Sequence, residues 1–250
     1  MRLLAALLFV LPCLAADLPP ADKLLEKALF NTGGEAAIAK YKASVMTGTI
    51  DMAGGALVGT VSTYQAENRT YSMIELPGIG KVEEGFDGET AWEMSAIQGV
   101  RVKDGPERDL AVRSAKMTPL SGWHDEYSAA KTVGEDVVEG RDTWKVEMTP
   151  KSGKPEMFFL DKESGLLVRM SATMATAMGD MAVDNLIGDY REVSGIQTPF
   201  KMVIKAMNQS MTMKFDKVSY QTAVPEGRFD LPAAVKAIVE KRKAAAPAAK

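Results

Sequence analysis

Methionine is the residue type with distinctive chemistry that this sequence concentrates. Eight of the sixteen methionines lie between Met170 and Met213, in the stretches "LLVRMSATMATAMGDM" and "KAMNQSMTMKF". Thioethers at this density can bind soft metal ions such as Cu(I), fill a core, or line a cavity for apolar ligands. These methionines continue apolar strand faces that Leu, Val, Ile or Phe begin, and no histidine lies near them in sequence. We therefore expect no metal site at these methionines.

Residue types that carry out catalysis are scarce. His124, in "SGWHDEY", is the single histidine, and Cys13 is the single cysteine. A Ser/His/Asp or Cys/His hydrolase needs a histidine base or its equivalent, and a zinc site needs several His or Cys ligands. Adjacent carboxylates such as Glu83 and Glu84 point to opposite faces of a strand, which suits solvation better than a glycosidase pair. We predict that the protein is not an enzyme.

Alternation of apolar and polar residues predicts the elements that position the methionines. From residue 42 onward it recurs over 90–95, 143–149, 166–174, 200–206 and 211–216, with turn residues between the segments. The spacing is too short for crossover helices, so we expect an antiparallel meander of about ten strands. Helical periodicity predicts helices over 21–31, 106–117 and 231–243.

Two architectures can bury so many apolar strand faces. One is a single sheet that curls into an incomplete barrel and encloses space, and the other is a two-sheet sandwich with a filled core. Sandwich cores typically use Val, Ile and Leu, so the methionines favour a lined, adaptable cavity. The strand pattern alone leaves both architectures open, within a fold class that is α+β and mainly β.

The chain ends and the net charge bound the cellular context. Residues 1–16 combine Arg2, an apolar run and small residues, which predicts a cleaved signal peptide and a periplasmic or secreted protein. The run is too short for a transmembrane anchor, and Pro12 before Cys13 does not fit a lipoprotein signal. We expect one domain over 17–243 and a flexible tail over 244–250. The net charge of −3, without a basic block, predicts no nucleic-acid partner.

Several segments resemble one known family. They are "GFDGETAWEM", "FFLDKESGLLVRM" and "GDYREVSGIQTPFKM", with "NTGGEAAIAKY" near the start and "FDLP" near the end. Over roughly residues 20–235 the chain resembles bacterial outer-membrane lipoprotein-sorting proteins of the LolA/LolB-like superfamily. The resemblance implies an incomplete antiparallel barrel wrapped around helices, an apolar cavity for acyl chains, and a periplasmic carrier or sensor without a cofactor. With it, the predicted fold class is α+β, mainly β, with a large curved antiparallel sheet whose concave face is covered by a few helices.

Two hypotheses about function follow. The first is a carrier that sequesters the acyl chains of a lipoprotein or lipid in the cavity. The second is an envelope sensor or protein-interaction module of the same fold, which would have a filled core and envelope proteins as partners. For the first, the residues expected to line the cavity are Trp92, Met94, Trp144, Val146, Met170, Met174, Met202, Ile204, Met211 and Met213.

Overall fold

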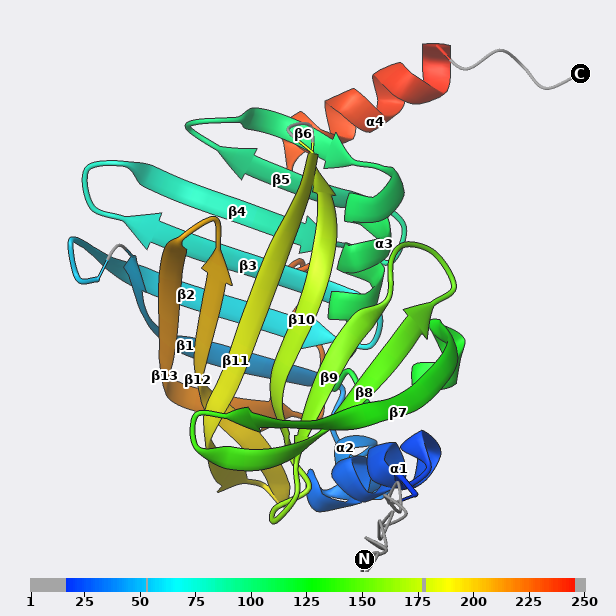
Figure 1. Cartoon of the computed structure of the whole chain (residues 1–250). Helices are drawn as coiled ribbons and strands as arrows, with labels where there is room; N and C mark the ends of the chain where they lie inside the picture. Colours follow the sequence, from blue (N-terminus) through cyan, green and yellow to red (C-terminus); the bar gives the residue numbers. More distant parts are fainter. Residues whose placement is uncertain (1–16, 53, 177–178, 246–250) are drawn as a thin grey trace, which may run out of the picture.

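One antiparallel sheet of thirteen strands forms most of the molecule (Figure 1). The computed structural model describes residues 17–52, 54–176 and 179–245. The strand order is β6-β5-β4-β3-β2-β1-β13-β12-β11-β10-β9-β8-β7. The predicted fold class is therefore confirmed, with more strands than the ten expected. Short edge strands such as the five-residue β6 (Gly99–Lys103) are difficult to predict, because they contain too few residues to establish an alternation.

The elements have the following bounds. The helices are α1 (Ala21–Asn31), α2 (Gly34–Ile38), α3 (Gly105–Ser114), the 3₁₀ turn η1 (Trp123–Asp125) and α4 (Ala233–Ala245). The strands are β1 (Ala43–Met52), β2 (Leu57–Ala66), β3 (Arg69–Leu76), β4 (Gly80–Phe86), β5 (Ala91–Ser95), β6 (Gly99–Lys103), β7 (Tyr127–Val138), β8 (Arg141–Pro150), β9 (Glu156–Asp161), β10 (Leu167–Thr176), β11 (Gly179–Val193), β12 (Ile196–Ala206) and β13 (Gln209–Gln221).

The first and last strands of the chain meet in the middle of the sheet. β1 pairs with β13, so the meander runs outward from this junction to the edge strands β6 and β7. The sheet curls until β1–β6 lie behind β9–β13 in Figure 1, and α3, which follows β6, lies on the side between the two halves. At the junction the register shifts between Thr47 and Gly48. A Cβ on Gly48 would collide with the carbonyl of Lys214, so only glycine fits this bulge.

The two faces of the curled sheet are covered differently. We call the face that contacts α1 and α3 the inner face. α3 packs on Phe86 and Ala91 of this face through Ala111 and Val112. The outer face of β1–β3 is covered by the segment after β13, where Phe229 packs on Ala43 and Ala66. α4 packs against the edge strand β6 and extends to Ala245, two residues beyond the predicted domain end at 243.

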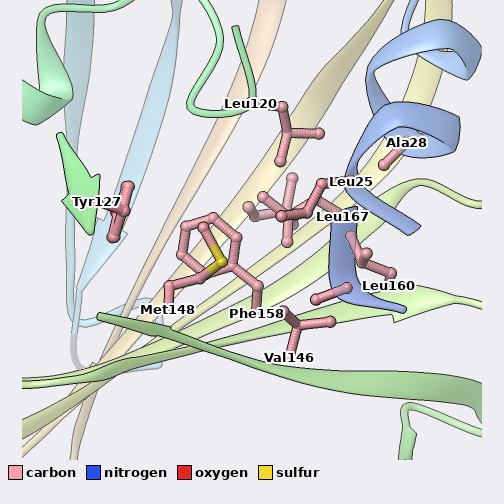
Figure 2. Packing of buried hydrophobic residues seen from close by; sticks show 11 residues of the cluster. Leu25, Ala28, Leu120, Tyr127, Val146, Met148, Phe158, Leu160 and Leu167 are labelled. Atoms are coloured by element: carbon pink, nitrogen blue, oxygen red, sulfur yellow. The ribbon is translucent and has the colours of Figure 1, made fainter. Parts of the chain in front are cut away.

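A filled core lies where α1 covers the inner face (Figure 2). Leu25 and Ala28 project from α1 onto Phe158 of β9, and Leu120 closes the cluster from the loop after α3. We call this cluster the α1 core; its buried members are Ala21, Leu25, Ala28, Leu120, Tyr127, Val146, Met148, Phe158, Leu160, Leu167 and Ile187. Leu25, Val146, Met148, Phe158 and Leu160 are at most 1% exposed, so this part of the interior has no space for a ligand.

A methionine-lined inner face and its cavity

Cross-strand pairing brings four of the predicted methionines onto one face of the sheet. Residues that face each other on neighbouring strands share one face, so successive pairs define a row across the sheet. The first row runs Val146, Phe158, Met170, Asn185, Ile204, Met211, Met52 and Leu57. The second, two residues along each strand, runs Ile187, Met202, Met213, Ile50 and Gly59. Both rows lie on the inner face, because Phe158 and Ile187 belong to the α1 core.

Beyond the α1 core, the two rows become rich in thioethers. We call Met170, Met202, Ile204, Met211, Met213 and Met52 the methionine stripe. All six are partly buried, in contrast to the fully buried Ile50 beside them. The strands of the stripe belong to both halves of the curled sheet, so the stripe lies along the concave surface. Unbranched thioether side chains at partly buried positions can repack around different apolar shapes.

A cavity of about 180 Å³ adjoins the α1 core end of the stripe. It is lined by Thr32, Ile38, Met117, Thr118, Pro119, Leu120, Leu167, Met170, Asn185, Ile187, Tyr190, Ile196, Gln197, Pro199, Met202 and Tyr220. The wall thus combines the ends of α1 and α2, the loop after α3, and four strands. Its lining is mainly apolar, as is usual for small-molecule sites.

The hydroxyl groups in the cavity wall are paired with protein atoms. Tyr190 donates to the carbonyl of Leu167 at 2.7 Å, and the Tyr220 hydroxyl lies 2.9 Å from Oγ1 of Thr198. Burial raises the pKa of Tyr190 and of Tyr220 above the ordinary value, because a buried phenolate would lose its hydration. Both phenols are therefore neutral at physiological pH, and they add no charge to the wall.

Two predicted lining residues fill the α1 core instead. Val146 is completely buried, and Trp144 packs against the cluster. The ammonium group of Lys162 lies over the Trp144 ring, 4.1 Å from its centroid, in a cation–π contact. Both residues lie on the inner face, as expected, but in its filled part rather than beside the cavity.

Trp92 and Met94 lie on the outer face. Trp92 pairs with Gly85, and Gly85 pairs with Tyr71 of β3, so the three residues share one face. Ile74, which lies on the inner face, is three residues from Tyr71 on β3, and an odd separation puts Tyr71 and Trp92 on the opposite face. The ring centroids of Trp92 and Tyr71 are 6.2 Å apart. Met94 is two residues further along the same strand and shares the outer face. The structure thus separates these two residues from the methionine stripe.

Met174 is the remaining predicted residue. Its backbone belongs to β10 and pairs with Met181 of β11. Its side chain lies outside the residues that the structure describes.

The sequence interpretation missed several parts of the cavity wall. Ile38, Met117 and Leu120 come from a short helix and a loop, whose contacts with the sheet have no local signature. Asn185 did leave a signal, because it interrupts the inner-face alternation of Val183 and Ile187 on β11. A polar residue in such a position needs a partner or a function.

The described residues offer little for catalysis or metal binding. Among them, no three His, Cys, Asp or Glu side chains gather as a metal site would require. His124 stacks on its neighbour Trp123, with ring centroids 3.7 Å apart. Within the described part of the chain, no helix is both long and apolar enough to cross a membrane.

Comparison with known proteins identifies the fold. No family model and no curated protein sequence matches the chain. A DUF1329 family protein from Desulfovibrio piger matches 84% of this chain and 97% of its own, with 17% identity and a TM-score of 0.57. A putative outer-membrane lipoprotein-sorting protein domain from Vibrio parahaemolyticus matches 84% of this chain and 97% of its own, with 12% identity and a TM-score of 0.56. A LolA superfamily protein from Nitrosomonas europaea matches 86% of this chain and 99% of its own, with 12% identity and a TM-score of 0.57. The chain therefore has a LolA/LolB-like fold.

Proposed function

We propose that this protein is a periplasmic carrier that sequesters the acyl chains of a lipoprotein or lipid on its inner face, without performing chemistry on them. The observation that carries the proposal is the methionine stripe, whose partly buried thioethers continue into an apolar cavity. A protein that used this face only for stability would fill it, as the α1 core is filled. The lipoprotein-sorting description of one structural neighbour supports the same function.

The size of the cavity constrains how a ligand enters. At about 180 Å³ it is smaller than common ligand pockets, which measure roughly 300–1,000 Å³. An acyl chain must therefore extend from the cavity along the stripe, where methionine rotamers can change to admit it. Each buried methylene contributes about 0.8 kcal/mol, so a chain of many methylenes supplies the driving force for binding without a specific polar contact.

Competition binding with a fluorescent fatty acid tests the proposal. The probe is 11-(dansylamino)undecanoate, whose emission rises in an apolar site, displaced by hexadecanoate. Met202→Trp places a large side chain between the cavity and the stripe, and we expect the Kd to rise at least about tenfold. Met73→Trp makes the same exchange at a partly buried methionine on the outer face, and it should leave the Kd within about twofold.

The outcomes separate the carrier from the interaction module. If the wild-type protein ignores the probe and hexadecanoate but captures a stoichiometric envelope protein, the carrier proposal fails and the interaction module is favoured. Equal weakening by both tryptophan variants would place the binding site elsewhere on the molecule.

A further inference from the structure

Asn185 is the polar member of an otherwise apolar row. Its cross-strand partners on the inner face are Met170 and Ile204, and Ile187 follows it on the same strand face. All but Ile204 contribute to the cavity wall. An amide at this position is surrounded by groups that cannot form strong hydrogen bonds with it.

The side-chain oxygen of Asn185 is buried and accepts no hydrogen bond from any residue that the structure describes. Among the residues that the structure describes, the other buried side-chain atoms without a hydrogen-bond partner are the Nε atoms of Arg101 and Arg113. Those two guanidinium groups are held by carboxylates through their other nitrogens, at 2.7 and 2.9 Å. Native proteins leave few buried polar atoms unpaired, so an exception in a cavity wall points to a ligand.

We propose that Asn185 determines specificity by selecting acyl chains that carry a hydroxyl group. The inference rests on the proposed acyl-chain carrier function and defines its ligand class more closely. A hydroxyl on the bound chain donates a hydrogen bond to Oδ1, whereas a plain alkyl chain covers the oxygen and leaves it unpaired. The site therefore favours the hydroxylated chain, because only that chain supplies a donor to an oxygen that is already buried and unpaired in the free protein.

The surroundings of Asn185 allow a chain to reach it. Met170 is its cross-strand neighbour and has an unbranched side chain, so a rotamer change can uncover the amide at small cost. The hydroxyl of Tyr190, in the same wall, is already donated to Leu167 and does not compete for Oδ1. Tyr127, whose hydroxyl is paired in the α1 core and which does not line the cavity, offers a control, since loss of that hydroxyl should not alter which chain is preferred.

Competition binding with matched ligand pairs tests the inference. The pairs are hexadecanoate with 3-hydroxyhexadecanoate, and octadecanoate with 12-hydroxyoctadecanoate, which place the hydroxyl at two depths. We expect the wild-type protein to prefer the hydroxylated member of at least one pair about tenfold, the effect of one hydrogen bond of about 1.4 kcal/mol. Asn185→Leu should reduce this preference to within about twofold by weakening the binding of the hydroxylated chain, whereas Tyr127→Phe should retain it.

Three results would count against the inference in distinguishable ways. Equal binding within both pairs by the wild-type protein would overturn it while leaving the carrier function intact. A preference that survives in Asn185→Leu would assign the selection to another residue. Binding of neither pair would overturn the carrier function itself. If Asn185→Leu does not fold, Asn185→Ala removes the acceptor without adding volume, and the same comparison applies.

Discussion

The α1 core and the methionine stripe lie on the same face of the same sheet, yet they are built differently. In the α1 core, Phe158 and its neighbours are completely buried under a helix. In the stripe, along the same row, Met170 is partly buried at the margin of the α1 core, and Met211 is partly buried against a cluster of strand residues that includes Ile50. The α1 core thus supplies stability through close packing, while the stripe keeps an apolar surface available. One row of the sheet serves both purposes because a helix covers only part of it.

Truncation in the two regions should have unequal costs. Phe158→Ala leaves a cavity in the α1 core and should lower the free energy of unfolding by about 3–5 kcal/mol. Met213→Ala, in the stripe, should cost no more than about 2 kcal/mol because its side chain is only partly buried. Urea unfolding monitored by circular dichroism measures both values. Equal costs would mean that the stripe is packed as tightly as the α1 core.

A buried ion pair connects the α1 core to α3. Arg113 of α3 lies 2.9 Å from Glu156, which also accepts a hydrogen bond from Tyr127 at 2.7 Å. Glu156→Gln leaves the guanidinium group without its counter-charge and should lower the free energy of unfolding by about 3 kcal/mol. Glu26→Gln, in the exposed pair with Lys23, is the matched control and should change it by less than about 1 kcal/mol. A similar loss in both variants would show that burial of the first pair has no energetic consequence.

Alkaline pH should weaken the α1 core through Tyr127. Burial, together with the charge of Glu156, raises the pKa of Tyr127 above its ordinary value of 10. Unfolded tyrosine ionises near pH 10 while native Tyr127 stays protonated, so its contribution to stability is present below pH 10 and is lost as the pH rises above it. Urea unfolding between pH 9 and 11 should show this fall, and Tyr127→Phe should make it shallower. An unchanged slope in the variant would assign the effect to other tyrosines.

Local sequence patterns predicted the helices and strands better than they predicted what packs around each of them. The helix expected over 21–31 is α1 with the same bounds, because its apolar spacing and the glycines after it are local signals. Alternation also places Met211 and Met213 on one face, as the structure does, whereas Met52 of the methionine stripe was not among the predicted residues. Alternation does not say which face of a strand points inward. On β5 the inner-face residue is Glu93, which pairs with Arg101 at 2.7 Å, while Trp92 occupies the outer face.

The cavity wall could not be predicted for a related reason. Ile38 and Leu120 reach it from segments whose position depends on the curl of the whole sheet, which no local window of sequence records. The segment that covers the outer face near Trp92 could not be predicted either. Trp92 lies beside Tyr71, and the guanidinium group of Arg228, from the segment after β13, lies 5.5 Å from the centroid of the Tyr71 ring. Contacts between distant segments therefore decided the features that sequence patterns left open.

Photocrosslinking tests the central claim most directly, because it reports where an acyl chain lies. Hexadecanoate carrying a diazirine in its chain is irradiated with the protein, and the modified peptides are mapped by mass spectrometry. We predict crosslinks on β10, β12 and β13 at the methionine stripe, which excess hexadecanoate abolishes. Crosslinks confined to the outer face around Met73 and Met94, or labelling that excess hexadecanoate does not reduce, would contradict the assignment of the stripe as the acyl-chain site.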